Sequence, residues 1–309
     1  MSIRIQTYHR GHLEGMLNVY DTQTADERFI APLTPEMFIG LVEKKSYFDP
    51  EGLFVAAEGD TVVGWVHACV AGGTERWHDA SRLVPQIRML LFPRHRLDVG
   101  IALVSEATRW MAQTGQPEHL AIHCKHGYPF YRGLWMGGEP MVPTRMTHIH
   151  TALSVGGFQP TAECVFQTAE LNGLPTKVKA KTALEFVTAP VDMMNTFMEE
   201  SWAGFEPCVT KAFVGEEQAG QIGWLMISGL SEKLGAPAVN IWMMGVSEAH
   251  RRKGIGTALV CEALTEGYRR GARFATVDTQ TYNIAALSTY RKFGFLPQRI
   301  IVGRTRQTP

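Results

Sequence analysis

The chain contains two copies of one sequence pattern, and this duplication strongly limits the folds that it can adopt. The segment from Phe54 to Trp65 matches the segment from Phe213 to Trp224, with Phe, Gly and Trp at the same positions, and both are typical of β-hairpins. Two further pairs match in the same order: D-V-G-I-A-L-V at 98–104 with G-I-G-T-A-L-V at 254–260, and G-F-Q-P at 157–160 with G-F-L-P at 294–297. Three matches in one order predict a tandem repeat of a single domain.

The length of the chain agrees with two domains. At 309 residues it is about twice as long as a typical domain, and 45% of its residues are apolar, which is enough for two hydrophobic cores. The sequence N-G-L-P at 172–175 and a short lysine run after it mark a connecting segment. We therefore expect an N-terminal domain at 1–171 and a C-terminal domain at 183–309.

In the second copy, a basic, glycine-spaced loop precedes a predicted amphipathic helix, within the segment from Val246 to Val260. Gly254 and Gly256 have no Cβ, so several backbone amides can approach one anion at the positive end of the helix. The basic side chains that stand directly before them are Arg251, Arg252 and Lys253. Together these features predict a phosphate-binding site.

The spacing distinguishes three kinds of phosphate loop. A Walker loop would need G-K-S/T, which is absent after these glycines. A dinucleotide-binding fingerprint would need Gly or Ala where Leu259 stands, although Asp278 lies about 20 residues further on, as such sites require. A nicotinamide-dependent oxidoreductase is therefore the weaker alternative. The pattern R-x-x-G-x-G after an apolar strand resembles the acetyl-CoA pyrophosphate loop of the GNAT superfamily of N-acetyltransferases.

A second segment extends this resemblance. N-I-A-A-L-S-T-Y-R-K-F-G-F-L-P at 283–297 is similar to the GNAT segment in which an Asn opens a helix along coenzyme A and a Tyr lies near the thioester sulfur. From the residues alone, Asn283 caps the helix and Gly294 ends it in a left-handed conformation. We accept a structural role for Gly294 and Phe295, and we expect Tyr290 to be catalytic.

The resemblance implies a fold and an activity. The implied fold class is α/β (α+β): two tandem GNAT-like domains, each a mixed, largely antiparallel sheet flanked by helices, in a layout similar to that of mycothiol synthase. The implied reaction is transfer of an acetyl or acyl group from acetyl-CoA to a small-molecule or peptide amine by direct attack in a ternary complex, with Tyr290 protonating the departing thiolate. The strand before the loop is implied to splay from its neighbour and to pair with the pantetheine arm. The implied cofactor-binding residues are Met244, Gly245, Val246, Arg251, Arg252, Lys253, Gly254, Ile255, Gly256, Thr257 and Asn283.

The first copy departs from this pattern. Aligning Gly100 with Gly256 puts Leu97 and Asp98 where the second copy has a lysine and a glycine. Aligning the later helices puts Leu153 opposite Tyr290. We therefore expect the N-terminal domain to be degenerate, without catalysis and without strong cofactor binding, and the C-terminal domain to be catalytic.

The pattern lacks an obvious general base. Many GNAT members carry a Glu on the strand before the loop, where this chain offers only Asn240 as a polar side chain. The possible substitutes, which the sequence does not rank, are Asp278, Glu216, Glu217 and His250. This gap keeps a second hypothesis open, in which the protein binds or senses acyl-CoA without catalysis.

Composition mainly excludes other classes of protein. Thirty basic residues balance thirty acidic ones, so we expect neither nucleic acid nor membrane as a partner. Five cysteines without C-x-x-C indicate reduced thiols and a cytoplasmic location, and we see no signal peptide and no apolar run near the roughly 20 residues of a membrane span. A monomer or a homodimer is equally compatible with these features.

One histidine-rich stretch offers possible zinc ligands. Five of the eleven histidines lie between His119 and His150, with Cys124 among them. Imidazole and thiolate both bind zinc. Their spacing matches no metal motif, however, so we expect no metal site and treat these histidines as residues of loops and strand edges.

Overall fold

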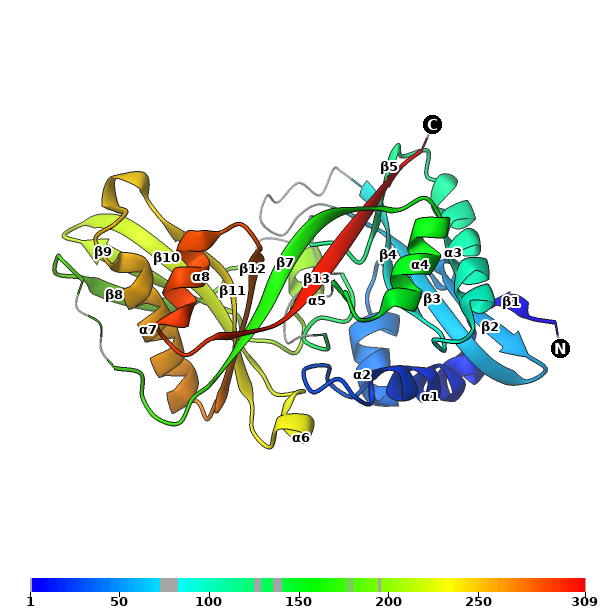
Figure 1. The fold of residues 1–309 in the computed structure, drawn as a ribbon, viewed down its shortest axis with the longest axis horizontal. Helices are drawn as coiled ribbons and strands as arrows, with labels where there is room; N and C mark the ends of the chain where they lie inside the picture. The colour runs from blue at the N-terminus through cyan, green and yellow to red at the C-terminus, as the bar shows by residue number, and fades with distance from the viewer. Residues whose placement is uncertain are drawn as a thin grey trace.

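In the computed structural model, one continuous β-sheet runs through both halves of the chain (Figure 1). The structure describes residues 2–72, 83–124, 129–135, 141–176, 178, 180–193 and 196–308. The N-terminal half contains β1 (Arg4–Thr7), η1 (Arg10–His12), α1 (Leu13–Thr24), α2 (Pro35–Phe38), η2 (Ile39–Glu43), η3 (Pro50–Gly52), β2 (Leu53–Glu58), β3 (Thr61–Gly72), β4 (Leu83–Leu91), α3 (Leu97–Ala112), β5 (Glu118–Ala121), β6 (Val142–Pro143), α4 (Thr147–Val155) and β7 (Gln159–Glu170). The C-terminal half contains β8 (Glu185–Pro190), α5 (Thr196–Ser201), β9 (Cys208–Val214), β10 (Glu217–Ile227), α6 (Ser231–Leu234), β11 (Ala238–Val246), η4 (Glu248–His250), α7 (Ile255–Arg269), β12 (Phe274–Gln280), α8 (Ile284–Arg291) and β13 (Leu296–Gln307).

The strand order shows that the two halves exchange their last strands. It runs β1-β2-β3-β4-β5-β13-β7-β12-β11-β10-β9-β8, with the short β6 paired to β13. Each half thus supplies five strands in chain order from its own edge of the sheet. At the centre, β13 lies beside β5 of the N-terminal half, and β7 lies beside β12 of the C-terminal half. The two central strands pair with each other antiparallel, and Figure 1 shows them crossing the middle of the molecule together.

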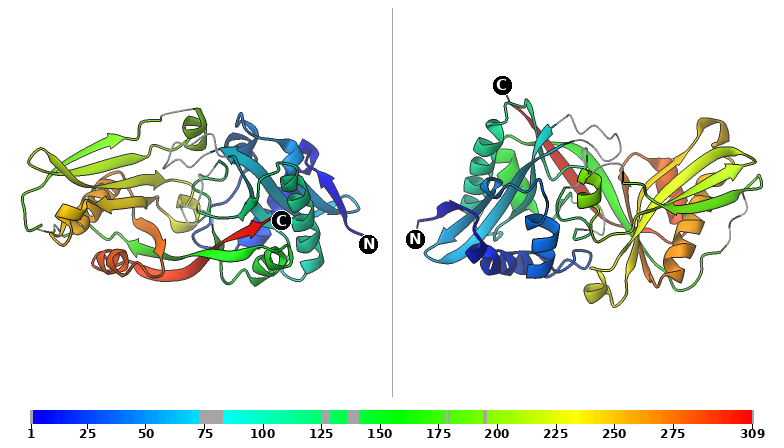
Figure 2. Two further views of the ribbon diagram at one scale, coloured as in Figure 1. Left: turned by 90° about the horizontal axis from the view of Figure 1, so that it is seen from above. Right: turned by 180° about the vertical axis from the view of Figure 1, so that it is seen from behind.

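The sequences of the two central strands suit an interior position. Residues 164–169 of β7 are buried without interruption, as expected for a strand that is covered on both faces. In β13, Ile301 and Val302 are buried in the same region. Figure 2 shows the result from two further sides: the C-terminus lies within the N-terminal half, because β13 crosses into it.

The helices of the two halves occupy equivalent positions. In the N-terminal half, α3 packs on β2, β3 and β4 and contacts α4. In the C-terminal half, α7 packs on β9, β10 and β11 and contacts α8. The observed architecture therefore confirms the expected fold class, a mixed and mostly antiparallel sheet flanked by helices in two related halves.

The division between the halves falls in one connecting segment. β7 ends at Glu170 and β8 begins at Glu185. Because the last strand of each half lies in the sheet of the other, the halves are not independent bodies. We keep 1–171 and 183–309 as the proposed division of the sequence.

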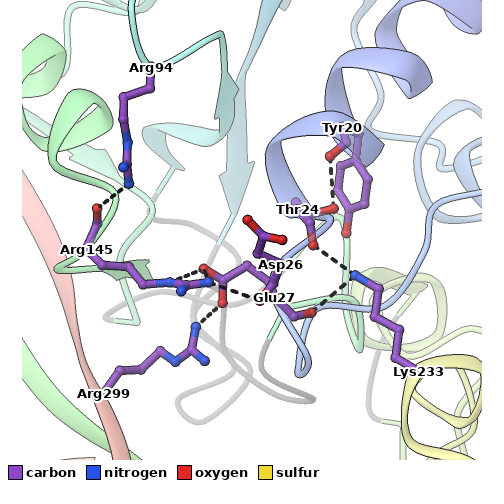
Figure 3. A network of polar contacts seen from close by, with 8 residues as sticks. All are labelled: Tyr20, Thr24, Asp26, Glu27, Arg94, Arg145, Lys233 and Arg299. Atoms are coloured by element: carbon purple, nitrogen blue, oxygen red, sulfur yellow. Dashed lines mark hydrogen bonds and ion pairs between the residues drawn. The ribbon is translucent and has the colours of Figure 1, made fainter.

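A buried carboxylate ties the end of α1 to the other half (Figure 3). Glu27 is buried, and its two carboxylate oxygens pair with Arg145, which precedes α4, and with Arg299 of β13. From α6, the ammonium group of Lys233 donates to the main-chain oxygens of Thr24, at 2.9 Å, and of Glu27, at 3.2 Å. Charged groups from both halves therefore meet at one short segment of the N-terminal half.

A second contact between the halves involves α5. The amide of Ser46 donates to the Glu200 carboxylate at 2.6 Å. The guanidinium of Arg132 lies 3.5 Å from the ring centroid of Trp202, close enough for a cation–π interaction. The short segment between β8 and β9 thus contacts the N-terminal half.

We predict that Glu27→Gln lowers the free energy of unfolding by about 3 kcal/mol, because it leaves two guanidinium groups without their buried counter-charge. Urea denaturation followed by circular dichroism measures this change. Glu14→Gln is the matched control, since Glu14 is exposed on α1 and its loss should cost less than about 0.5 kcal/mol. Equal losses in the two variants would contradict the structural role of the Glu27 pairs.

Candidate active site

The sheet of the C-terminal half opens between β11 and β12. These parallel strands pair over four residues, ending at Ile241 opposite Val277, and no further pair between them follows in the described part of the chain. β11 continues to Val246, and its pairing with β10 skips Trp242. The edge of residues 243–246 that faces β12 therefore keeps its backbone groups available, as the resemblance implies for the pantetheine-binding strand.

The loop after β11 is held in an uncommon backbone conformation. Gly254 has φ of 86° and precedes α7 directly, and Arg252 has φ of 64°, which few residues other than glycine adopt. The first hydrogen bond of the helix runs from the amide of Ala258 to the oxygen of Gly254 at 3.0 Å. The amides of residues 255–257 consequently have no acceptor within the helix and form a positive helix end.

The helix α8 begins at the predicted cap. The side-chain oxygen of Asn283 accepts from the amide of Ala286 at 3.2 Å, and its nitrogen lies 3.3 Å from the Thr279 hydroxyl. Gly294 has φ of 79°, in the left-handed region. Both structural roles expected from the sequence are confirmed.

The loop, the open strand edge and α8 surround one cavity of about 1480 Å³. Tyr290 and all of the residues that the sequence assigns to cofactor binding line it. These residues come from three separate segments: the end of β11, the loop and first turn of α7, and α8. The structure thus brings the whole predicted set to one place, while the role of each residue remains a prediction.

Tyr290 lies in the wall of the cavity with only 4% of its surface exposed. Its ring packs against that of Phe295, with the centroids 5.5 Å apart. Burial raises the pKa of the Tyr290 hydroxyl well above its ordinary value, and the negative charge of nearby Asp278 raises it further. The hydroxyl therefore stays protonated and able to donate a hydrogen bond.

The structure separates the four candidate bases into two pairs. Asp278 and His250 line the cavity, whereas Glu216 and Glu217 are not among its described lining residues. Glu217 contacts His250, because its carboxylate lies 3.6 Å from the Nδ1 atom of the imidazole. Asn240, the polar residue on the strand before the loop, is buried, and its side-chain amide donates a hydrogen bond to the Thr276 hydroxyl of β12. Its role is therefore to stabilise the sheet.

Five charged, thiol-bearing or aromatic residues of the lining were not assigned from the sequence. Lys181 comes from the connecting segment and Lys292 follows α8, while Cys124 and Cys164 belong to the N-terminal half. The fifth is Trp242, which the bulge of β11 turns aside from regular pairing. The lysine run of the connecting segment was a visible signal, but only the fold shows that this segment passes the loop.

The N-terminal half opens its sheet in the same way, but side chains fill the opening. β4 and β5 pair only at two positions, ending at Ile87 opposite Ala121. Phe92 is fully buried beside α3, so close that a Cβ on Gly100 would come within 2.2 Å of its ring. Leu153, aligned with Tyr290, is also fully buried. Apolar groups thus occupy this position.

One arginine of the basic loop in the N-terminal half is paired with carboxylates. The guanidinium of Arg96 pairs with Glu58 and with Asp98, each at 2.8 Å. These hydrogen bonds lower the pKa of both carboxyl groups. An arginine that is held by two carboxylates is poorly placed to bind a phosphate, which supports the expected degeneracy of this copy.

The histidine-rich stretch shows no metal cluster in the residues that the structure describes. His126 lies outside the described residues. Burial is the main cause that lowers the pKa of His119 and His150, and it lowers that of His148 to about 4, so these imidazoles are neutral. All five cysteines are free thiols, and no described helix has the length and apolarity to cross a bilayer.

Residues 182–295 match the model of the acetyltransferase (GNAT) family. The C-terminal half belongs to the GNAT family. Among curated proteins, an acetyl transferase of rice (Oryza sativa subsp. japonica), GW6a, is 42% identical over 72 residues. That match covers 23% of this chain and 17% of the rice protein.

Solved structures extend the GNAT fold to the whole chain. A tandem GNAT protein from the clavulanic acid biosynthesis pathway has a TM-score of 0.65 at 16% identity, covering 100% of this chain and 99% of that one. A glucosamine N-acetyltransferase region of a fungal multi-domain beta-N-acetylglucosaminidase has a TM-score of 0.71 at 13% identity. The latter match covers 98% of this chain but only 38% of the fungal chain. The protein therefore has a tandem GNAT architecture, and these low identities establish the fold alone.

We predict that the wild-type protein binds one tight acetyl-CoA per chain and that Gly256→Trp abolishes this binding, because the indole would fill the space before α7. A Cβ at Gly256 meets no atom closer than 3.7 Å, so the backbone tolerates a side chain there. Gly40→Trp is the control, since a Cβ at this N-terminal glycine has no neighbour within 4 Å. Isothermal titration calorimetry decides: unchanged affinity in Gly256→Trp refutes the site, and two equal tight sites refute the degeneracy of the N-terminal half.

Proposed function

We propose that this protein is an acyltransferase that moves an acetyl group from acetyl-CoA to an amine. The observation that carries the proposal is the cavity in which the positive end of α7, the strand edge of β11 that does not pair with β12 and Tyr290 meet. The membership of the C-terminal half in the GNAT family supports it. The N-terminal half would then serve as a packing partner and wall rather than as a second catalytic centre.

The lining residues fit the chemical groups of acetyl-CoA. The amides at the start of α7 and the basic loop residues suit a pyrophosphate. The free edge of residues 243–246 suits the two amides of a pantetheine arm, which can pair with it like a neighbouring strand. When bound, acetyl-CoA supplies an activated acyl group as a thioester.

Tyr290 would act on the leaving sulfur. A hydroxyl whose pKa lies above that of a thiol donates a hydrogen bond to a thiolate more readily than it gives up its proton. Burial also removes competing water, which strengthens this hydrogen bond. Tyr290 thus stabilises the charge that develops on sulfur as the carbon–sulfur bond breaks.

The amine must lose a proton to attack as a neutral nucleophile. Asp278 and His250 are the cavity residues able to accept it, directly or through water. Holding the amine and the thioester together would provide most of the rate gain by positioning, with no covalent acyl-enzyme. Cys124 and Cys164 place the N-terminal half in the same wall, so both halves shape the space that an acceptor would enter. The free thiols support a reducing compartment, and we keep the cytoplasm as the proposed location.

The proposed function predicts release of free coenzyme A that depends on an amine. Acetyl-CoA should be cleaved when the protein is incubated with a panel of small amines, aminoglycosides and peptides, with thiol release followed by a colorimetric reagent. Mass spectrometry of the acceptor checks that the acetyl group is transferred rather than hydrolysed. Tight acetyl-CoA binding without transfer to any acceptor would favour the alternative, a protein that binds or senses acyl-CoA.

We predict that Tyr290→Phe lowers kcat by about 10- to 100-fold while acetyl-CoA affinity stays unchanged, because only the donor to sulfur is lost. Tyr282→Phe is the matched control, since this tyrosine is exposed near the start of α8 and should retain full activity. Steady-state kinetics and calorimetry on both variants provide the measurement. A parallel loss of affinity in Tyr290→Phe would assign the residue to packing instead.

A further inference from the structure

The cavity holds more positive charge than a pyrophosphate needs. Of the described residues that line it, Asp278 is the only acid. The basic lining side chains are Lys181, Arg251, Arg252, Lys253 and Lys292. The two phosphates of a pyrophosphate diester carry about one negative charge each, and the loop with the helix end already provides for both. The two lysines from outside the loop therefore indicate a further anionic group.

The connecting segment is fastened beside the phosphate loop at two points. The amide of Lys181 donates to the main-chain oxygen of Lys253 at 3.0 Å, which fixes Lys181 next to the loop. Earlier in the segment, the Cys261 thiol of α7 lies 3.6 Å from the main-chain oxygen of Thr176. The segment between the halves is thus part of the wall, and Lys181 enters the cavity from it.

Lys292 approaches the same helix end from α8. Its ammonium group lies 3.4 Å from the Thr257 hydroxyl in the first turn of α7. A smaller recess of about 220 Å³ adjoins the cavity, and Lys292 and Val178 line both spaces. The lining of the recess includes the apolar Leu171, Leu264 and Phe293, which suit a flat nucleobase, as well as polar residues, among them Glu170. Lys292 therefore stands between a place for a base and a place for a pyrophosphate.

We propose that Lys181 and Lys292 bind the 3′-phosphate of coenzyme A and make the protein selective for the 3′-phosphorylated cofactor. This inference rests on the proposed function. In coenzyme A the ribose joins the adenine to the pyrophosphate, so its 3′-phosphate falls between the two places that Lys292 separates. A phosphomonoester carries about 1.5 to 2 negative charges at neutral pH, which matches the two additional lysines.

The test compares coenzyme A with 3′-dephospho-coenzyme A by calorimetry. The wild-type protein should prefer coenzyme A, and Lys181→Gln and Lys292→Gln should each weaken its binding by about tenfold, the value of one charge-assisted hydrogen bond. Neither variant should change the affinity for dephospho-coenzyme A, and the double variant should not distinguish the two ligands. Raised salt should reduce the preference of the wild type, because screening weakens exposed charge pairs.

Lys211→Gln is the matched control, because Lys211 is exposed on β9 outside the cavity and its loss removes the same charge. It should leave both affinities as they are in the wild type. Equal weakening of both ligands in the lysine variants would place these residues at the pyrophosphate and overturn the inference, as would no weakening at all. Wild-type binding of both ligands without discrimination overturns the inference alone. Failure of the wild type to bind either ligand overturns the proposed function as well.

Discussion

The antiparallel pairing of β7 with β13 is the interaction on which the rest of the structure depends. Each strand ends one copy of the repeat and lies within reach of the other copy's sheet, so neither half can close its sheet alone. Backbone hydrogen bonds along this pair, with buried side chains on both faces, join two cores into one body. The ion pairs of Glu27 add to this connection, since Arg299 lies on β13 itself.

The exchange of strands also sets the geometry of the cavity. Because β7 must reach β12 and the chain must then return to the far edge at β8, the connecting segment has to travel along α7. That path carries Lys181 past the loop before α7. The same exchange places Cys164 of β7 in the wall, opposite Gln280 of β12. Residues of the N-terminal half thus reach the cavity through sheet pairing, without any need for a separate docking surface.

Much of the fold and of the candidate site could be predicted from the sequence, and the remaining features could not, for physical reasons. The repeat, the loop at Gly254 and the cap at Asn283 depend on local patterns, and all are observed. The exchange of β7 and β13 could not be predicted, because apolar periodicity states that a strand is buried but not which strand lies beside it. Lys292 and Asp278 face the cavity only through tertiary packing. The four candidate bases could not be ranked until the fold placed Asp278 and His250, but neither Glu216 nor Glu217, among the described residues that line the cavity.

The contrast between the two copies follows from one constraint on an open sheet. Splayed strands leave a gap that must hold either a ligand or side chains, since empty apolar space forfeits dispersion contacts. The N-terminal copy fills its gap with Phe92 and pairs Arg96 with two carboxylates. The C-terminal copy leaves the gap open, with the end of β11, the start of α7 and α8 around it, and so gives up packing next to the smaller of the two core clusters. Its sheet is joined to the filled copy through β7, which pairs with β12, so the open copy packs against a half whose own gap is filled.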